Sequence, residues 1–149
     1  MKKLIKLLSL VLVLTFTLTL VACSSYGKLE KAFTKKGYTV SESFDGILND
    51  LKEDADKKDI AVTPHLLVKA SGITTDTIWI LEFKATDDMK EFVENSNQAQ
   101  GSIKDVSTDQ NAKDFYEALE SAGYVNGNCL VLSTNPLNRA EVIEIVKNA

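Results

Sequence analysis

The sequence predicts a single-domain α+β sandwich, in which a sheet of about four antiparallel or mixed strands packs with about four to five helices. Three observations favour this class. Apolar side chains recur at i, i+3 and i+4 over several segments of helical length. Residues 65–71 and 77–84 are successive strand-like stretches joined by a short connection that contains Gly72, as in a β-hairpin. No internal repeat and no linker rich in Pro, Gly or Ser divides residues 28–149, so one layered domain accommodates all the elements.

In the first half of this domain, the sequence predicts two helices and a strand before the hairpin. A helix over residues 28–36 ends at Gly37, which is a common helix stop. Residues 38–43 form a short strand, and a second helix covers residues 44–57 around an Asp-Gly turn. The outer face of the second helix mixes acids with lysines and lacks the spacing of an EF-hand. We therefore expect a solvated face there and no calcium site.

In the second half of the domain, the sequence predicts three further helices and a fourth strand. A helix opens at residues 86–88 with a threonine cap and two acids at its positive end. A polar loop over residues 95–105 follows, and the next helix begins with a capping box made by Ser107 and Gln110. That helix ends at Gly123. The remaining elements are a turn at residues 126–127, a strand over 128–133 and a closing helix over 136–147.

The strand over residues 77–84 is apolar on both faces. By its period of two, Trp79 points to one side of the sheet, while Ile78 and Ile80 point to the other. If the helices cover only one face, Ile78, Trp79 and Ile80 contribute to an exposed partner surface. The alternative is a central strand covered by helices on both sides, which also reads as a continuous apolar run.

The N-terminus has the layout of a secretory signal. Residues 1–6 carry three lysines and no acid, and the uncharged apolar run that follows is shorter than the roughly 20 residues of a spanning helix. The run ends in Leu20-Val21-Ala22-Cys23, which resembles the lipobox of bacterial lipoproteins. The resemblance covers the first 23 residues. It implies that residues 1–22 are a lipoprotein signal peptide and that Cys23, the first mature residue, carries a diacylglyceryl group. An ordinary secretory signal cut after Ala22 is the alternative.

The resemblance also implies an address at the cell membrane, lipid-anchored on the extracytoplasmic face. Two acyl chains give stable anchoring, and residues 23–27 leave only a short tether, so the domain lies close to the bilayer. The first predicted helix carries a basic stripe formed by Lys28, Lys31, Lys35 and Lys36. These lysines are candidates for facing an anionic leaflet, and the alternative is a plain solvated helix face.

Composition and residue types exclude several classes of function. The formal net charge is −4, and it becomes −7 without the three leader lysines, so binding to nucleic acid is disfavoured. No nucleotide-binding, hydrolase-elbow or zinc-protease motif occurs, and no metal site or cofactor is expected. His65 is the one histidine and Cys129 lies in an apolar strand, so a structural histidine and a buried thiol are expected. No family signature surrounds either residue to support a catalytic dyad of Cys129 and His65. No catalytic residue is therefore assigned.

These observations lead to three hypotheses of different classes. The favoured one is a non-catalytic protein-interaction module of the cell envelope, which binds another envelope protein. The second is a lipoprotein that binds a small molecule or a peptide, although solute-binding proteins of transporters generally have two lobes and about twice this length. The third is an envelope hydrolase that uses carboxylates or His65.

Overall fold

The computed structural model describes residues 24–43, 46–96, 114–133 and 135–149. Three predicted features lie outside these described residues. They are the predicted signal peptide with Cys23, nearly all of the predicted polar loop at 95–105, and the predicted capping box at Ser107 and Gln110. The described residues form one antiparallel sheet and five α-helices, so the α+β class is confirmed.

The sheet has five strands where about four were expected. They are β1 (Thr39–Ser41), β2 (Val62–Ser71), β3 (Thr74–Phe83), β4 (Val125–Asn126) and β5 (Cys129–Ser133), in the order β1-β2-β3-β5-β4. All four pairings are antiparallel, so the mixed alternative is wrong. The additional strand is β4, a two-residue edge strand that the predicted turn at Gly127 joins to β5.

The β2–β3 hairpin is the centre of the sheet and is confirmed. It pairs ten residues on each strand, from Val62 opposite Phe83 to Ser71 opposite Thr74. Only Gly72 and Ile73 form the turn, and Gly72 takes a φ of +64°, a conformation that glycine adopts without steric cost. β3 therefore begins three residues before the predicted 77, because so tight a turn leaves little of the connection outside the ladder. β2 ends at Ser71 as predicted but begins at Val62, three residues early, and β3 ends at Phe83, one residue before the predicted 84.

The helices end close to their predicted positions, and most of them also begin there. They are α2 (Ser25–Lys35), α3 (Gly46–Lys57), α4 (Thr86–Asn95), α6 (Phe115–Ala122) and α7 (Arg139–Asn148), with a 3-10 turn, η1 (Pro136–Asn138), before α7. The boundary expected at residue 28 is wrong, because Ser24 caps a helix that starts at Ser25. The expected threonine cap is also wrong: Ala85 precedes α4 and makes no side-chain cap bond. Gly123 ends α6 as predicted, with a φ of +91°. The start of α6 expected at Ser107 is wrong, because Asp114 caps a helix that begins at Phe115.

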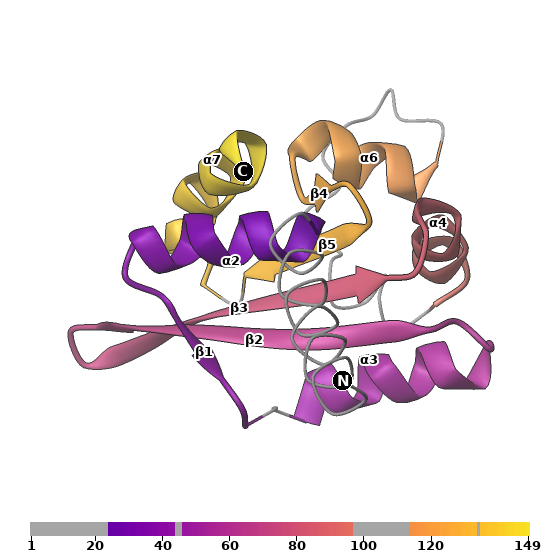
Figure 1. The fold of residues 1–149 in the computed structure, drawn as a ribbon, viewed down its shortest axis with the longest axis horizontal. Coiled ribbons are helices and arrows are strands. Elements are labelled where there is room, and N and C mark those ends of the chain that lie inside the picture. The colour runs from indigo at the N-terminus through magenta and orange to yellow at the C-terminus, as the bar shows by residue number, and fades with distance from the viewer. Residues whose placement is uncertain (1–23, 44–45, 97–113, 134) are drawn as a thin grey trace, which may run out of the picture.

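Helices cover both faces of the sheet, as Figure 1 shows. On one face α2 and α7 lie side by side and bury a core that includes Phe33 and Val142. On the other face α3, α4 and α6 bury a second core that includes Leu51, Phe92 and Leu119. The sheet is thus the middle layer of three.

The two cores correct the expectation of an exposed partner surface on β3. Ile78 and Ile80 are 0% exposed and lie in the core under α2 and α7, whereas Trp79 is 7% exposed and lies in the opposite core. The alternation of side chains was therefore predicted correctly, and the strand is covered on both sides. The exposed large hydrophobic side chains of the described residues lie elsewhere, at Val40, Ile47, Ile73 and Leu137.

Candidate functional site

The four candidate lysines lie on or next to the outer face of α2. At 100° per residue, Lys28, Lys31 and Lys35 fall on the side of the helix opposite the buried Leu29 and Phe33. Lys36 is the C-terminal cap of the same helix. All four lysines are exposed, and none forms an ion pair within the described ranges.

The first turn of α2 already packs on the core of the domain. Ser24 Oγ accepts a hydrogen bond from the Gly27 N–H at 3.0 Å, which satisfies one of the free donors of the first turn. Tyr26 is 7% exposed. Cys23 lies outside the described residues, but the residue after it is already the cap of a helix that packs on the sheet. Of the residues 23–27 that were expected to form a tether, Ser25, Tyr26 and Gly27 belong to α2.

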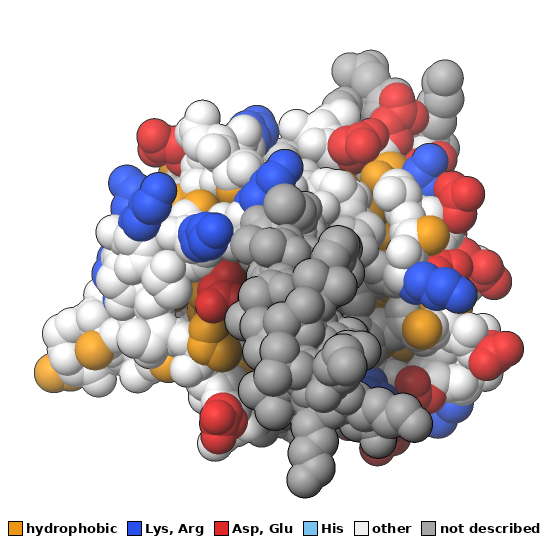
Figure 2. Space-filling view, in the orientation of Figure 1, with side chains coloured by type: hydrophobic (Ala, Val, Ile, Leu, Met, Phe, Trp, Pro, Cys, Tyr) orange, Lys and Arg blue, Asp and Glu red, His pale blue; other side chains and the backbone are white. Residues whose placement is uncertain are grey.

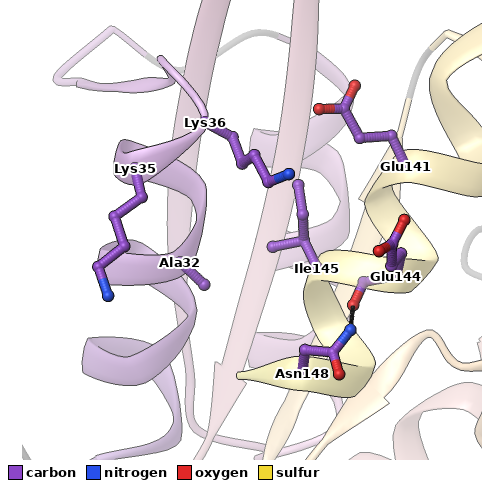
Figure 3. Close-up of a pocket in the computed structure, with 7 residues that line it drawn as sticks. All are labelled: Ala32, Lys35, Lys36, Glu141, Glu144, Ile145 and Asn148. Carbon is purple, nitrogen blue, oxygen red and sulfur yellow. Dashed lines mark hydrogen bonds between the residues drawn. The ribbon is translucent and has the colours of Figure 1, made fainter.

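A groove runs between α2 and α7, on the side where Lys36 lies (Figure 3). Its volume is about 320 Å³, which is at the lower end of the range for ligand sites. Lys36 reaches across the groove toward α7, whereas Lys35 points away from it. The lining residues are Ala32, Lys35, Lys36, Glu141, Glu144, Ile145 and Asn148.

The two walls of this groove carry opposite charges. The α2 wall supplies the Lys36 ammonium, and the α7 wall supplies the carboxylates of Glu141 and Glu144, with Ala32 and Ile145 as apolar lining between them. Glu141 Oε1 lies 4.0 Å from Lys69 Nζ. Lys36 and Glu144 have no ion-pair partner among the described residues. Such a groove is complementary to a ligand or segment that carries both charges.

A second cluster surrounds His65 beneath the first turn of α2. His65 Nε2 lies 3.1 Å from Glu82 Oε2, and the Tyr26 ring stacks on the imidazole with centroids 3.5 Å apart. Glu82 pairs in register with Cys129 on β5. Sequence reasoning placed His65 at the start of a strand. The structure places it inside β2, on the face that α2 covers.

The electrostatics of this cluster are those of a buried structural contact. Burial lowers the pKa of His65, although the hydrogen bond and charge of Glu82 and the charge of Glu30 oppose the shift. Burial, with the charge of Glu82, raises the pKa of Cys129 to about 12. The Cys129 thiol is 0% exposed and stays protonated at neutral pH, so it is not an activated nucleophile.

Sequence reasoning missed the acidic residues at both sites, which are Glu141 and Glu144 in the groove and Glu82 beside His65. Glu141 and Glu144 recur at i, i+3 on the last helix, and that spacing could have indicated one charged face. Their position opposite Lys36 depends on how α2 and α7 pack, which no local pattern specifies. The strand's period of two places Glu82 on the same face as Ile78 and Ile80, but its contact with His65 depends on the hairpin register.

Comparison with known proteins identifies no family for this chain. The chain matches no protein-family model, no curated protein and no solved structure. Within residues 24–43, 46–96, 114–133 and 135–149, no group of three or more His, Cys, Asp and Glu side chains is placed to hold a metal ion. No helix in those same ranges has the length and apolar character needed to cross a bilayer.

Proposed function

We propose that this chain is a lipoprotein of the cell envelope, anchored on the extracytoplasmic face of the membrane, whose domain is a non-catalytic protein-interaction module. The observation that carries the proposal is the short distance along the chain from Cys23 to the core. Ser24 caps α2, and Tyr26 is already packed on the sheet. A diacylglyceryl group on Cys23 therefore joins the bilayer to a folded domain with almost no flexible chain between them.

This attachment restricts which partners the domain can reach. A domain of this size is roughly 35 Å across, so a partner has to present its contact within about that distance of the bilayer. Membrane proteins and other anchored envelope proteins meet this condition. Holding both partners at one surface also raises their effective concentration, which favours weak and reversible contacts.

Co-purification from native membranes tests the proposal. The lipidated protein is crosslinked mildly in its membranes, purified and analysed by mass spectrometry, beside Cys23→Ala. We expect a stoichiometric envelope protein that is lost with Cys23→Ala. The matched control is Cys129→Ala, which removes the other cysteine and leaves the anchor, and it should retain the partner. A protein that purifies alone from wild-type membranes contradicts the proposal.

A second candidate is the binding of a small zwitterion or a peptide, and the groove between α2 and α7 favours it. A ligand with a carboxylate and an amine could place them against Lys36 and Glu144. Free amino acids and short peptides are suitable probes, because a ligand that binds only the folded state raises Tm. Lys36→Glu should abolish such a rise, whereas Lys57→Glu on the opposite face of the sheet should not.

No catalytic role is proposed for His65 or Cys129. The imidazole lies beneath the Tyr26 ring and is held by Glu82, and the thiol stays protonated. An envelope hydrolase would need a nucleophile or an activated water beside this histidine. If His65→Asn lowered a hydrolytic activity of envelope preparations, this part of the proposal would be wrong.

A further inference from the structure

Charge is divided between the two helical layers. The layer formed by α2, Lys36 and α7 carries six basic and three acidic side chains, a net charge of +3. The layer formed by α3, α4, α6 and the cap residue Asp114 carries three basic and eleven acidic side chains, a net charge of −8. In Figure 2, basic side chains gather at the upper left, over α2 and α7, and acidic ones prevail on the right, over α4 and α6.

The outward charge of the basic layer comes from α2. Lys28, Lys31 and Lys35 project from the side of the helix opposite its buried side chains, and they have no ion-pair partner within the described part of the chain. The charges on α7 cancel one another, because two basic and two acidic side chains lie along that helix. The three lysines are therefore free to meet an external anion.

The acidic layer does not cancel the attraction between the α2 lysines and an anionic surface. Packed layers lie about 10 Å apart, so the two helical layers are separated by about 20 Å with the sheet between them. The Debye length at physiological ionic strength is about 8 Å. A surface that touches α2 thus interacts with the lysines and only weakly with the acids on the other side.

We propose that the α2 face lies on the anionic surface of the bilayer, with the acidic layer of α3, α4 and α6 turned away from it. This inference rests on the proposed function, because it requires the anchor at Cys23 to place α2 beside lipid. The anchor holds one end of α2, and the lysines select which side of the helix rests on the lipid. The attraction is worth about fivefold in partitioning per lysine. The reverse orientation is disfavoured, because it would bring the exposed acids of the other layer against the same anionic surface.

Amine footprinting of the reconstituted protein tests this orientation. The full lipidated chain is placed in vesicles of phosphatidylcholine alone, or of equal parts phosphatidylcholine and phosphatidylglycerol, and is acylated briefly with a membrane-impermeant amine reagent. Mass spectrometry then gives the labelling rate of each lysine. We expect the rates of Lys28, Lys31 and Lys35 to fall several-fold in anionic vesicles relative to Lys57 and Lys90, which lie on the acidic layer. High salt should remove this protection.

A charge-reversed variant and its matched control make the test specific. The double variant Lys28→Glu, Lys31→Glu changes only exposed positions outside the core, so the fold should persist. This variant should abolish the protection of Lys35. The same reversal at Lys57 and Lys90 should leave the protection of Lys35 intact.

The remaining outcomes separate the inference from the proposed function. Equal labelling of both layers in anionic vesicles overturns the orientation while leaving the anchor intact. A chain that does not float with vesicles at high salt has no lipid anchor, and the proposed function fails. Protection that appears only in native membranes, and never in protein-free anionic vesicles, assigns the α2 face to a protein partner and overturns the inference.

Discussion

Tyr26 of α2 stacks on His65 of β2, with ring centroids 3.5 Å apart and ring planes inclined by 11°. The tyrosine lies in the first turn of its helix, and the histidine lies on the face of the sheet that the helix covers. Glu82 on the neighbouring strand holds the imidazole from the side. The stack therefore ties the end of α2 that follows Cys23 to the centre of the sheet.

Removal of this stack should loosen that end of α2. Tyr26→Ala deletes an aromatic side chain that is 7% exposed, and we expect it to lower the free energy of unfolding by about 3 kcal/mol. Tyr26→Phe keeps the ring and should lower it by less than about 1 kcal/mol. Urea unfolding of both variants measures the difference. Equal losses would mean that the hydroxyl, and not the stacked ring, provides the stabilisation.

His65 makes the stability of the domain dependent on pH. Because burial lowers the pKa of this imidazole in the folded state, protonation favours the unfolded chain, whose histidine has a pKa of about 6.5. The contribution is fully present above about pH 6.5 and is lost as the pH falls from there through the lower folded pKa.

Urea unfolding at pH 7.5 and at pH 5.5 measures this contribution. We expect wild-type protein to lose more stability over that interval than His65→Asn, which has no imidazole to protonate. Carboxylates contribute to both proteins, so the difference between the two losses isolates the histidine. Identical losses would show that the imidazole titrates as it does in the unfolded chain.

Asp76 fastens the start of β3 to the turn before α7. It is 2% exposed, and it accepts hydrogen bonds from the side-chain amides of Asn135, at 2.6 Å, and Asn138. Asp76→Ala leaves both donors without their acceptor and should cost about 3 kcal/mol of unfolding free energy. Asn138→Ala removes one of the two bonds and should cost clearly less. A smaller loss for Asp76→Ala than for Asn138→Ala would contradict this arrangement.

Two glycines with nearly the same backbone conformation form a matched pair. Gly37 has a φ of +89° and Gly123 a φ of +91°. A Cβ at Gly37 would meet only Lys69 Cε, at 3.8 Å, whereas one at Gly123 would press on Lys147 and lie 3.0 Å from Ile143 Cγ2. Gly37→Ala should therefore cost about 1 kcal/mol for the backbone alone. Gly123→Ala should cost more, and thermal unfolding compares the two. Equal costs would mean that α7 shifts without strain.

Local patterns predicted much of this fold. The alternation of Ile78, Trp79 and Ile80 was correct because it follows from strand geometry, and Gly123 was a reliable helix stop. Whether β3 is covered on both faces was left open, because coverage depends on where helices distant in sequence pack. The start of α2 was placed three residues late, because serine and glycine are common in turns and loops, and Ser24, Ser25 and Gly27 occupy this segment although Ser24 acts as the helix cap.

The candidate site was predicted only in part. The lysines of α2 follow from helical spacing alone, so the sequence was sufficient to group them. The groove needs α7 beside α2, and the Tyr26–His65–Glu82 contacts need α2 on the hairpin at one register. Tertiary packing decides both, and a single sequence carries no local signal for it.

Lipid on Cys23 is the premise from which the address, the reach and the orientation of this domain follow. The most direct test is the intact mass and the N-terminal peptide of the protein extracted from washed native membranes. We expect a chain that begins at Cys23 and carries a diacylglyceryl group, recovered in the membrane fraction. A chain that begins at another residue, or an unmodified Cys23 recovered in the soluble fraction, would contradict the anchored module.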